Sequence, residues 1–127
     1  MLVESLRLTD DERLLLSGLM EYAGPAHGAA VVAPVVGAAS QEEFFRLTDR
    51  LYAAIRDNEP LSDLEWARAP VLTEICWASN LLGAASDFGT NMSDERALVA
   101  LRSVQRKISS GAMRQLLVDN ALTPGAN

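Results

Sequence analysis

The stretch Ser62–Gly83, SDLEWARAPVLTEICWASNLLG, predicts the helix around which the rest of the chain folds. Its apolar residues point in nearly every direction around a helical axis, and a helix of this kind lies in the interior of a soluble domain. Both tryptophans of the chain, Trp66 and Trp77, and its only cysteine, Cys76, fall within this stretch. We therefore expect the neighbouring helices to pack around it.

Pro70 lies inside this predicted helix, eight residues after Ser62. A proline has no main-chain N–H to donate, and its ring collides with the preceding turn, so it is tolerated best near a helix start. We therefore expect a kink or a break near residues 66–69.

Three copies of the capping-box pattern, a Ser or Thr followed three residues later by Glu, predict helix starts at Thr9, Ser40 and Ser62. Apolar residues follow each start at helical spacing. Together with the apolar seam that follows Ser93, they predict helices over residues 10–23, 41–56, 62–83 and 94–109, and a final short helix around 113–117.

The Ala- and Val-rich residues 26–39, AHGAAVVAPVVGAA, are harder to assign. Their small side chains favour a helix, whereas valine tolerates either a helix or a strand. We expect a short helix over about 28–36, broken near Pro34 and ended by Gly37, with a strand as the competing assignment.

These elements indicate an all-α fold, a compact bundle of about five or six helices around the central apolar helix, residues 62–83. A chain of 127 residues suits a single hydrophobic core. We expect one helical domain over residues 1–120 and a flexible C-terminal tail over residues 121–127.

The composition predicts a cytoplasmic protein. The longest apolar run, residues 29–39, is far shorter than the roughly 20 residues of a membrane-spanning helix. The N-terminus lacks the basic start and apolar stretch of a secretory signal. A single cysteine cannot form a disulfide within the chain, which agrees with a reducing compartment.

Charge is divided unevenly along this acidic chain, whose net charge is −6. Residues 1–95 contain 16 acidic and 6 basic residues, whereas residues 96–127 contain 1 acidic and 5 basic residues. This division predicts that the C-terminal helix is held on the acidic body partly by charge, within the same chain or across a dimer.

Glu74 stands alone among the apolar residues of the central stretch. A buried carboxylate must be paired or neutralised, because an isolated buried charge is costly. We expect an ion pair or hydrogen bond that fixes how the helices dock; the alternative is a functional carboxylate in a pocket. The candidate partners are Arg68, Arg102, Arg106 and His27.

A pocket between the central helix and its neighbours is the candidate small-molecule site. Its residues, which could equally form a buried polar cluster at the core margin, combine one aromatic wall with polar side chains. They are Glu74, Trp77, Asn80 and Asp87.

No catalytic residues, cofactor or metal site are predicted. A nucleophilic Cys76 would need a base beside it, and His27 is the only imidazole in the chain. A buried cysteine that serves as a small hydrophobic residue is the favoured interpretation. Zinc is disfavoured, because the chain has one His, one Cys and no paired-ligand motif.

Basic residues near the C-terminus form the candidate interaction face. Nucleic acid is an improbable partner for it, because the body is acidic and the helix over 41–56 begins with Glu42 and Glu43. The face consists of Arg102, Arg106, Lys107 and Arg114.

The absence of a catalytic constellation and the excess of apolar helix surface predict a non-catalytic protein-interaction or regulatory module. It would act as a homodimer or as an acidic, inhibitor- or immunity-like protein that binds a basic partner. Specificity is expected at the basic face and in segment 29–39. One alternative is a small-molecule binder or enzyme with a pocket around Glu74 and Trp77, and another is a weak nucleic-acid binder through the basic segment 96–114.

Overall fold

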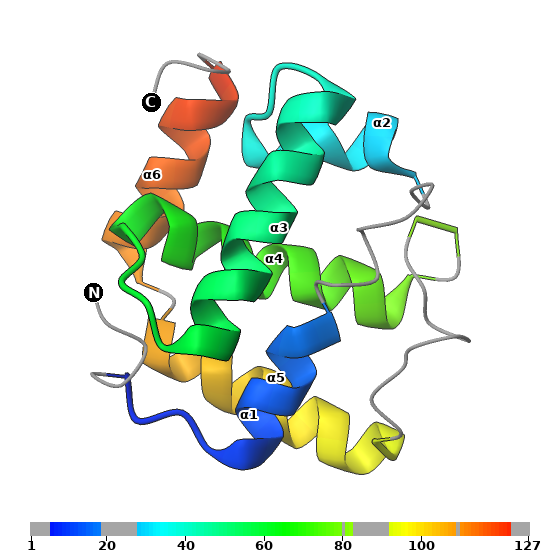
Figure 1. The fold of residues 1–127 in the computed structure, drawn as a ribbon, viewed down its shortest axis with the longest axis vertical. Helices are drawn as coiled ribbons and strands as arrows, with labels where there is room; N and C mark the ends of the chain where they lie inside the picture. Colours follow the sequence, from blue (N-terminus) through cyan, green and yellow to red (C-terminus); the bar gives the residue numbers. More distant parts are fainter. Residues whose placement is uncertain (1–5, 19–27, 80, 83–91, 109, 123–127) are drawn as a thin grey trace.

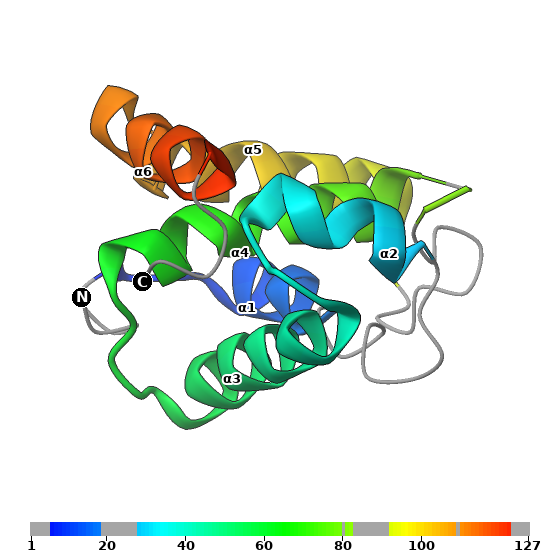
Figure 2. The ribbon, with the colours of Figure 1, turned by 90° about the horizontal axis from the view of Figure 1, so that it is seen from above.

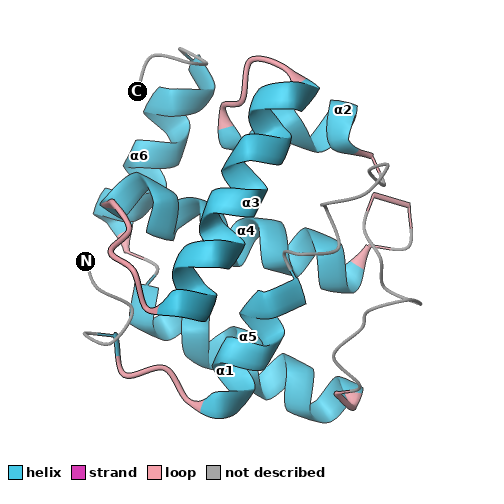
Figure 3. Ribbon diagram, in the orientation of Figure 1, coloured by secondary structure: helices cyan, strands magenta, loops and turns pink. Residues whose placement is uncertain are grey.

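The computed structural model describes residues 6–18, 28–79, 81–82, 92–108 and 110–122. Helices make up the secondary structure of these ranges, and no strand occurs in them (Figure 3). The predicted all-α fold class is therefore confirmed. The elements are α1 (Asp10–Leu16), α2 (Ala29–Val32), the 3₁₀ helix η3 (Ala33–Val36), α3 (Gln41–Asp57), α4 (Asp63–Ala78), α5 (Asp94–Ile108) and α6 (Gly111–Leu122).

Helix α4 lies in the middle of the bundle, in contact with α1, α5 and α6 (Figures 1 and 2). The side chains of Trp66, Leu72 and Cys76 on α4 are fully buried. The central position predicted for this helix is confirmed. The predicted break is wrong, because α4 continues as a helix through Pro70, and the alternative of a kink near residues 66–69 stays a prediction.

The C-terminal end of α4 comes earlier than the sequence pattern predicts. The helix ends at Ala78, and Ser79 adopts an extended conformation. The hydroxyl of Ser79 then accepts a hydrogen bond from the main-chain N–H of Leu82 at 2.9 Å. Leu81, which the apolar pattern places in the core, is 89% exposed.

Two of the three predicted capping boxes form completely. The hydroxyls of Thr9 and Ser62 each accept from the N–H three residues later, and the Glu side chain accepts from the N–H of the capping residue in return. Ser40 caps α3 by accepting from the N–H of Glu43 at 3.1 Å. The carboxylate of Glu43 accepts instead from the N–H of Ala39, at 3.0 Å.

Two other predicted helix ends differ from the structure. Helix α1 ends at Leu16, before the predicted end at residue 23, and residues 19–23 of the predicted helix lie outside the described residues. Helix α6 extends to Leu122, so residues 121–122 of the predicted tail are helical, and residues 123–127 lie outside the described residues.

The Ala- and Val-rich segment forms the helix that the sequence predicts, and the strand alternative is wrong. Helix α2 changes to the 3₁₀ helix η3 at Ala33, the residue before Pro34. Gly37 ends η3 in the left-handed conformation, with φ of 74°. The segment thereby buries one apolar side, formed by Ala29, Val32, Ala33 and Val36.

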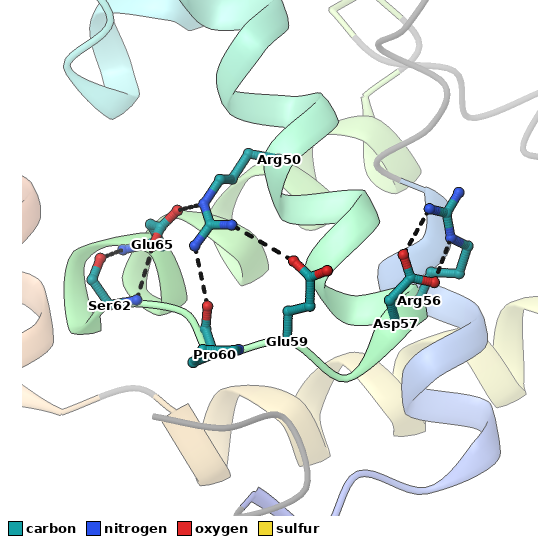
Figure 4. Close-up of polar contacts among 7 residues, drawn as sticks. All are labelled: Arg50, Arg56, Asp57, Glu59, Pro60, Ser62 and Glu65. Carbon is teal, nitrogen blue, oxygen red and sulfur yellow. Dashed lines mark hydrogen bonds and ion pairs between the residues drawn. The ribbon is translucent and has the colours of Figure 1, made fainter.

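An arginine of α3 organises the connection to α4 (Figure 4). The Nε of Arg50 donates to Oε2 of Glu65 at 2.8 Å, and its Nη2 donates to the carbonyl oxygen of Pro60 at 3.1 Å. Burial raises the pKa of Glu65, but the N–H of Ser62 and the guanidinium of Arg50 outweigh burial and hold this pKa below its ordinary value. The contact fixes the angle at which the chain enters the central helix.

Helices α1 and α5 meet along a seam of opposite charges. On the exposed edge, Nη2 of Arg96 donates to Asp11 at 2.5 Å and, by this hydrogen bond, holds the pKa of Asp11 below its ordinary value. Deeper in the seam, Nζ of Lys107 lies 2.5 Å from Oε1 of Glu12, whose side chain is 1% exposed. The hydroxyl of Ser103 donates to the same oxygen at 3.3 Å. These charge contacts hold α5 on α1 within one chain, whereas the charge-based docking predicted for the C-terminal helix, α6, stays a prediction.

Replacement of Lys107 by methionine is expected to lower the free energy of unfolding by about 2 kcal/mol, because it leaves the buried carboxylate of Glu12 without its cationic donor. Urea denaturation measures the loss. Arg106→Met is the matched control, since Arg106 is exposed on the same helix, and should change the free energy by less than about 0.5 kcal/mol. Equal losses in the two variants would contradict the role of the buried pair.

Gly37 and Gly111 predict opposite responses to alanine. At Gly37, φ is positive and an added Cβ would collide with the side chain of Asn120, so Gly37→Ala should destabilise the fold by about 2 kcal/mol. At Gly111, a Cβ meets no atom within 4 Å, so Gly111→Ala should be neutral or stabilise α6 by about 0.5 kcal/mol. Thermal melts of the two variants provide the comparison. Similar shifts in both would argue against the close approach of Gly37 to α6.

Candidate functional site

A groove of about 440 Å³ lies between α4 and α6, with residues at the C-terminal end of α5 also in its lining. We call it the α4–α6 groove. It combines an apolar floor with polar side chains near its rim, which is the usual composition of a ligand site. The lining residues are Ala67, Pro70, Val71, Glu74, Gln105, Ile108, Ser110, Gly111, Met113, Arg114 and Leu117.

The helical repeat explains why these residues share one surface. On α4, Ala67, Pro70, Val71 and Glu74 follow the spacing of a single helix face, and this face extends for about 10 Å. Helix α6 lies at the periphery of the bundle, beside α4 (Figure 2). Its apolar side chains on this side are only half-buried, which leaves the groove open to solvent.

Glu74 is exposed, so the prediction that it is buried is wrong. Its carboxylate forms no ion pair or hydrogen bond with any residue in the described part of the chain, including Arg68, Arg102 and Arg106. His27 lies outside the described residues. The buried stripe of α4 passes through Leu72, Thr73 and Cys76, and Glu74 lies to the side of it, at the groove. The apolar residues next to Glu74 in the sequence therefore do not cover its carboxylate in the structure.

The four predicted pocket residues do not form one site. Trp77 is half-buried and packs against Leu15, Ala97 and Leu101 at the junction of α1 and α5, away from the groove lining. Asn80 and Asp87 lie outside the described residues. Of the predicted set, Glu74 alone among described residues lines the groove.

Arg68 forms a buried polar cluster with Val36 and Asn120. The sequence pattern does not predict this cluster. Its side chain is 6% exposed, with Nε donating to the carbonyl oxygen of Val36 at 2.9 Å and Nη2 donating to Oδ1 of Asn120 at 2.5 Å. Burial lowers the pKa of Arg68, and the carboxylates of Glu43 and Glu65 oppose this shift. Asn120, the last residue before the predicted tail, is buried and accepts the hydrogen bond from Arg68. The one feature of the sequence that could have indicated this cluster is the presence of an arginine in an otherwise apolar helix.

The predicted basic face is divided among different contacts. Lys107 pairs with Glu12, and Nη1 of Arg102 donates to the side chain of Gln105 at 3.1 Å. Arg106 is exposed, and Arg114 lines the α4–α6 groove. Fewer cations than expected are therefore available to bind a nucleic acid or an acidic partner.

A second hollow, of about 310 Å³, lies between α1 and α3. Its two arginines are engaged by the protein itself. Nη1 of Arg13 donates to the carbonyl oxygen of Ile55 at 3.1 Å, and Arg56 pairs with Asp57 and lies over the ring of Tyr52. This hollow is therefore a weaker candidate for a charged ligand than the α4–α6 groove.

Cys76 is fully buried, and its thiol donates to the carbonyl oxygen of Gly18 at 3.6 Å. This environment is that of a packed hydrophobic residue and agrees with the favoured interpretation of the sequence. Across the described ranges, no three His, Cys, Asp or Glu side chains gather in a group that could hold a metal ion. The expectation of no metal or cofactor stays a prediction.

Comparison with protein-family models, with curated proteins and with solved structures finds no match to this chain. None of the helices among the described residues has both the length and the apolar character needed to cross a bilayer.

The thiol of Cys76 is expected to react with a disulfide reagent only when the fold opens, because its side chain is fully buried. In the native protein the reaction should be slow and should accelerate in parallel with urea-induced unfolding. The urea-unfolded protein, in which the same thiol reacts at once, is the control. Rapid stoichiometric modification of the native protein would contradict the buried position and reopen a nucleophilic role.

Proposed function

We propose that this protein is a non-catalytic interaction module that pairs with a second copy of itself through the outer side of α2 and η3. The proposal is carried by one observation, which is that this segment is apolar on its solvent side as well as on its core side. We call the outer side the valine surface. It consists of Ala30, Val31, Pro34 and Val35.

Exposure distinguishes this segment from an ordinary surface helix. Val31 is 59% exposed and Val35 is 50% exposed, although the outer side of a surface helix is usually polar. Residues 29–39 contain no polar side chain. Exposed apolar surface of this kind is typical of a protein-binding site.

The charge of the chain favours a second copy at this surface. Each molecule has a net charge of −6, so two copies repel each other where acidic residues face one another. Residues 22–41 contain no Asp, Glu, Lys or Arg. A two-fold contact centred there brings no like charges together, and its identical patches complement each other.

Two exposed apolar residues of α5 offer a less favourable contact. Leu98 and Val99 on α5 are 46% and 67% exposed, but they lie between Glu95, Arg96 and Arg102 on a charged helix. The acid–base contacts of α1 and α5 are already used within the chain. A dimer through the valine surface is therefore apolar, and salt should not dissociate it.

Light scattering coupled to size-exclusion chromatography of the whole chain tests this dimer across protein and salt concentrations. We expect a dimer that persists in high salt and that becomes a monomer in Val31→Glu and Val35→Glu, because each variant buries two like charges at the two-fold contact. Val99→Glu is the matched control, since it adds the same charge at an equally exposed valine of α5.

The results separate the possible partners. A wild-type monomer at every concentration overturns self-association, as does a dimer that Val99→Glu disrupts and Val35→Glu does not. A complex with a basic protein that forms only in low salt would instead favour the acidic, inhibitor-like alternative. Circular dichroism confirms that each variant retains its helices.

A further inference from the structure

We propose that the α4–α6 groove binds a small apolar zwitterion, a molecule that carries one protonated amine and one carboxylate on a hydrocarbon body. This site is separate from the valine surface, and its occupation does not depend on dimerisation. The proposal follows from three properties of the groove, which are its size, its apolar floor and the two charges at its margin.

The size of the groove suits a small molecule. Its volume of about 440 Å³ falls within the range of about 300–1,000 Å³ that ligand sites occupy. The groove is open along one side, so a ligand can enter without a change in the fold. The face of α4 that forms one wall is about 10 Å long, which limits the ligand to the size of a dipeptide.

The floor of the groove provides apolar contact from three helices. Pro70 and Val71 belong to α4, Ile108 to α5, and Met113 and Leu117 to α6. Met113 is unbranched and polarisable, so it can adapt to ligands of different shape. A hydrocarbon body placed here removes apolar surface from water on both partners.

Two opposite charges complete the site. Glu74 from α4 and Arg114 from α6 are the charged members of the described lining, and both are exposed. Neither side chain bonds to another residue that the structure describes. Both are therefore available, one to accept a hydrogen bond from an ammonium group and the other to bind a carboxylate with its planar guanidinium.

The balance of these charges selects a zwitterion over a simple anion or cation. A ligand with a single charge satisfies one side chain and leaves the other with solvent, whereas a zwitterion satisfies both. Each hydrogen bond between a charged group of the ligand and a charged side chain of the groove stabilises the complex enough to lower the dissociation constant about tenfold. Gln105 and Ser110 supply further polar contacts near the same margin.

The dipeptide leucyl-phenylalanine is the probe, compared with its N-acetyl derivative, which lacks the amine charge, and its C-terminal amide, which lacks the carboxylate. Titrations of the isotope-labelled whole chain, followed by amide NMR shifts, give the dissociation constants. We expect saturable one-to-one binding of the dipeptide at millimolar concentration, with shifts at Val71, Glu74 and Arg114. Each derivative should bind about tenfold more weakly.

Variants then assign each charge to its partner. Glu74→Gln should weaken the dipeptide about tenfold and leave the N-acetyl derivative unchanged, whereas Arg114→Gln should weaken the dipeptide and leave the C-terminal amide unchanged. Glu95→Gln and Arg106→Gln, exposed charges outside the groove lining, are the controls and should change nothing.

A steric variant tests the location of the site. Gly111 lines the groove and an added Cβ there meets no atom within 4 Å, so Gly111→Phe is designed to place an aromatic ring in the groove. It should abolish binding while the melting temperature stays within a few degrees of the parent value. Val35→Glu should leave binding unchanged, which separates this site from the proposed dimer contact.

Three outcomes would overturn the proposal. They are the absence of saturable binding at millimolar dipeptide, equal weakening of both derivatives by Glu74→Gln and by Arg114→Gln, and full binding by a folded Gly111→Phe variant. The crossed pattern of losses supports it, because general electrostatic attraction does not distinguish the amine end from the carboxylate end.

Discussion

The guanidinium of Arg68 fixes two peripheral elements on the central helix. It donates to the carbonyl oxygen of Val36 in η3 and to the side chain of Asn120 on α6. Both acceptors are distant from Arg68 in the sequence, so no local sequence pattern predicts these contacts. A buried cation requires such acceptors, because isolation from water without them is costly. Together with the direct packing of α6 on α4, this side chain therefore sets the position of α6 beside the groove.

The uneven charge of the chain has its main effect inside the molecule. The acidic start of α1 faces the basic side of α5, where Asp11 meets Arg96 and Glu12 meets Lys107. Because these four side chains pair within the chain, they are not available to form ion pairs with a second protein. Two surfaces of the described residues lie outside this seam and carry the proposals above: a charge-free outer side on α2 and η3, and a groove with one acid and one base.

Local chemistry made the helix starts predictable, because the capping residues and the first apolar turn lie within a few positions of each other. The burial of single charges was not predictable in this way. Glu74 has apolar sequence neighbours but lies on the open side of α4, whereas Glu12 resembles an ordinary capping residue and is buried. Its partner, Lys107, is 95 residues away, and no local pattern reveals that contact.

Lys107 is also the only lysine of the chain, since the other ten basic residues are arginines. Acylating reagents that modify side-chain amines consequently have one target, and its nitrogen is the one that neutralises the buried Glu12. Acylation would remove that positive charge and add bulk at the contact between the first and fifth α-helices. In this protein, therefore, acylation of the single lysine also removes a contact that stabilises the fold.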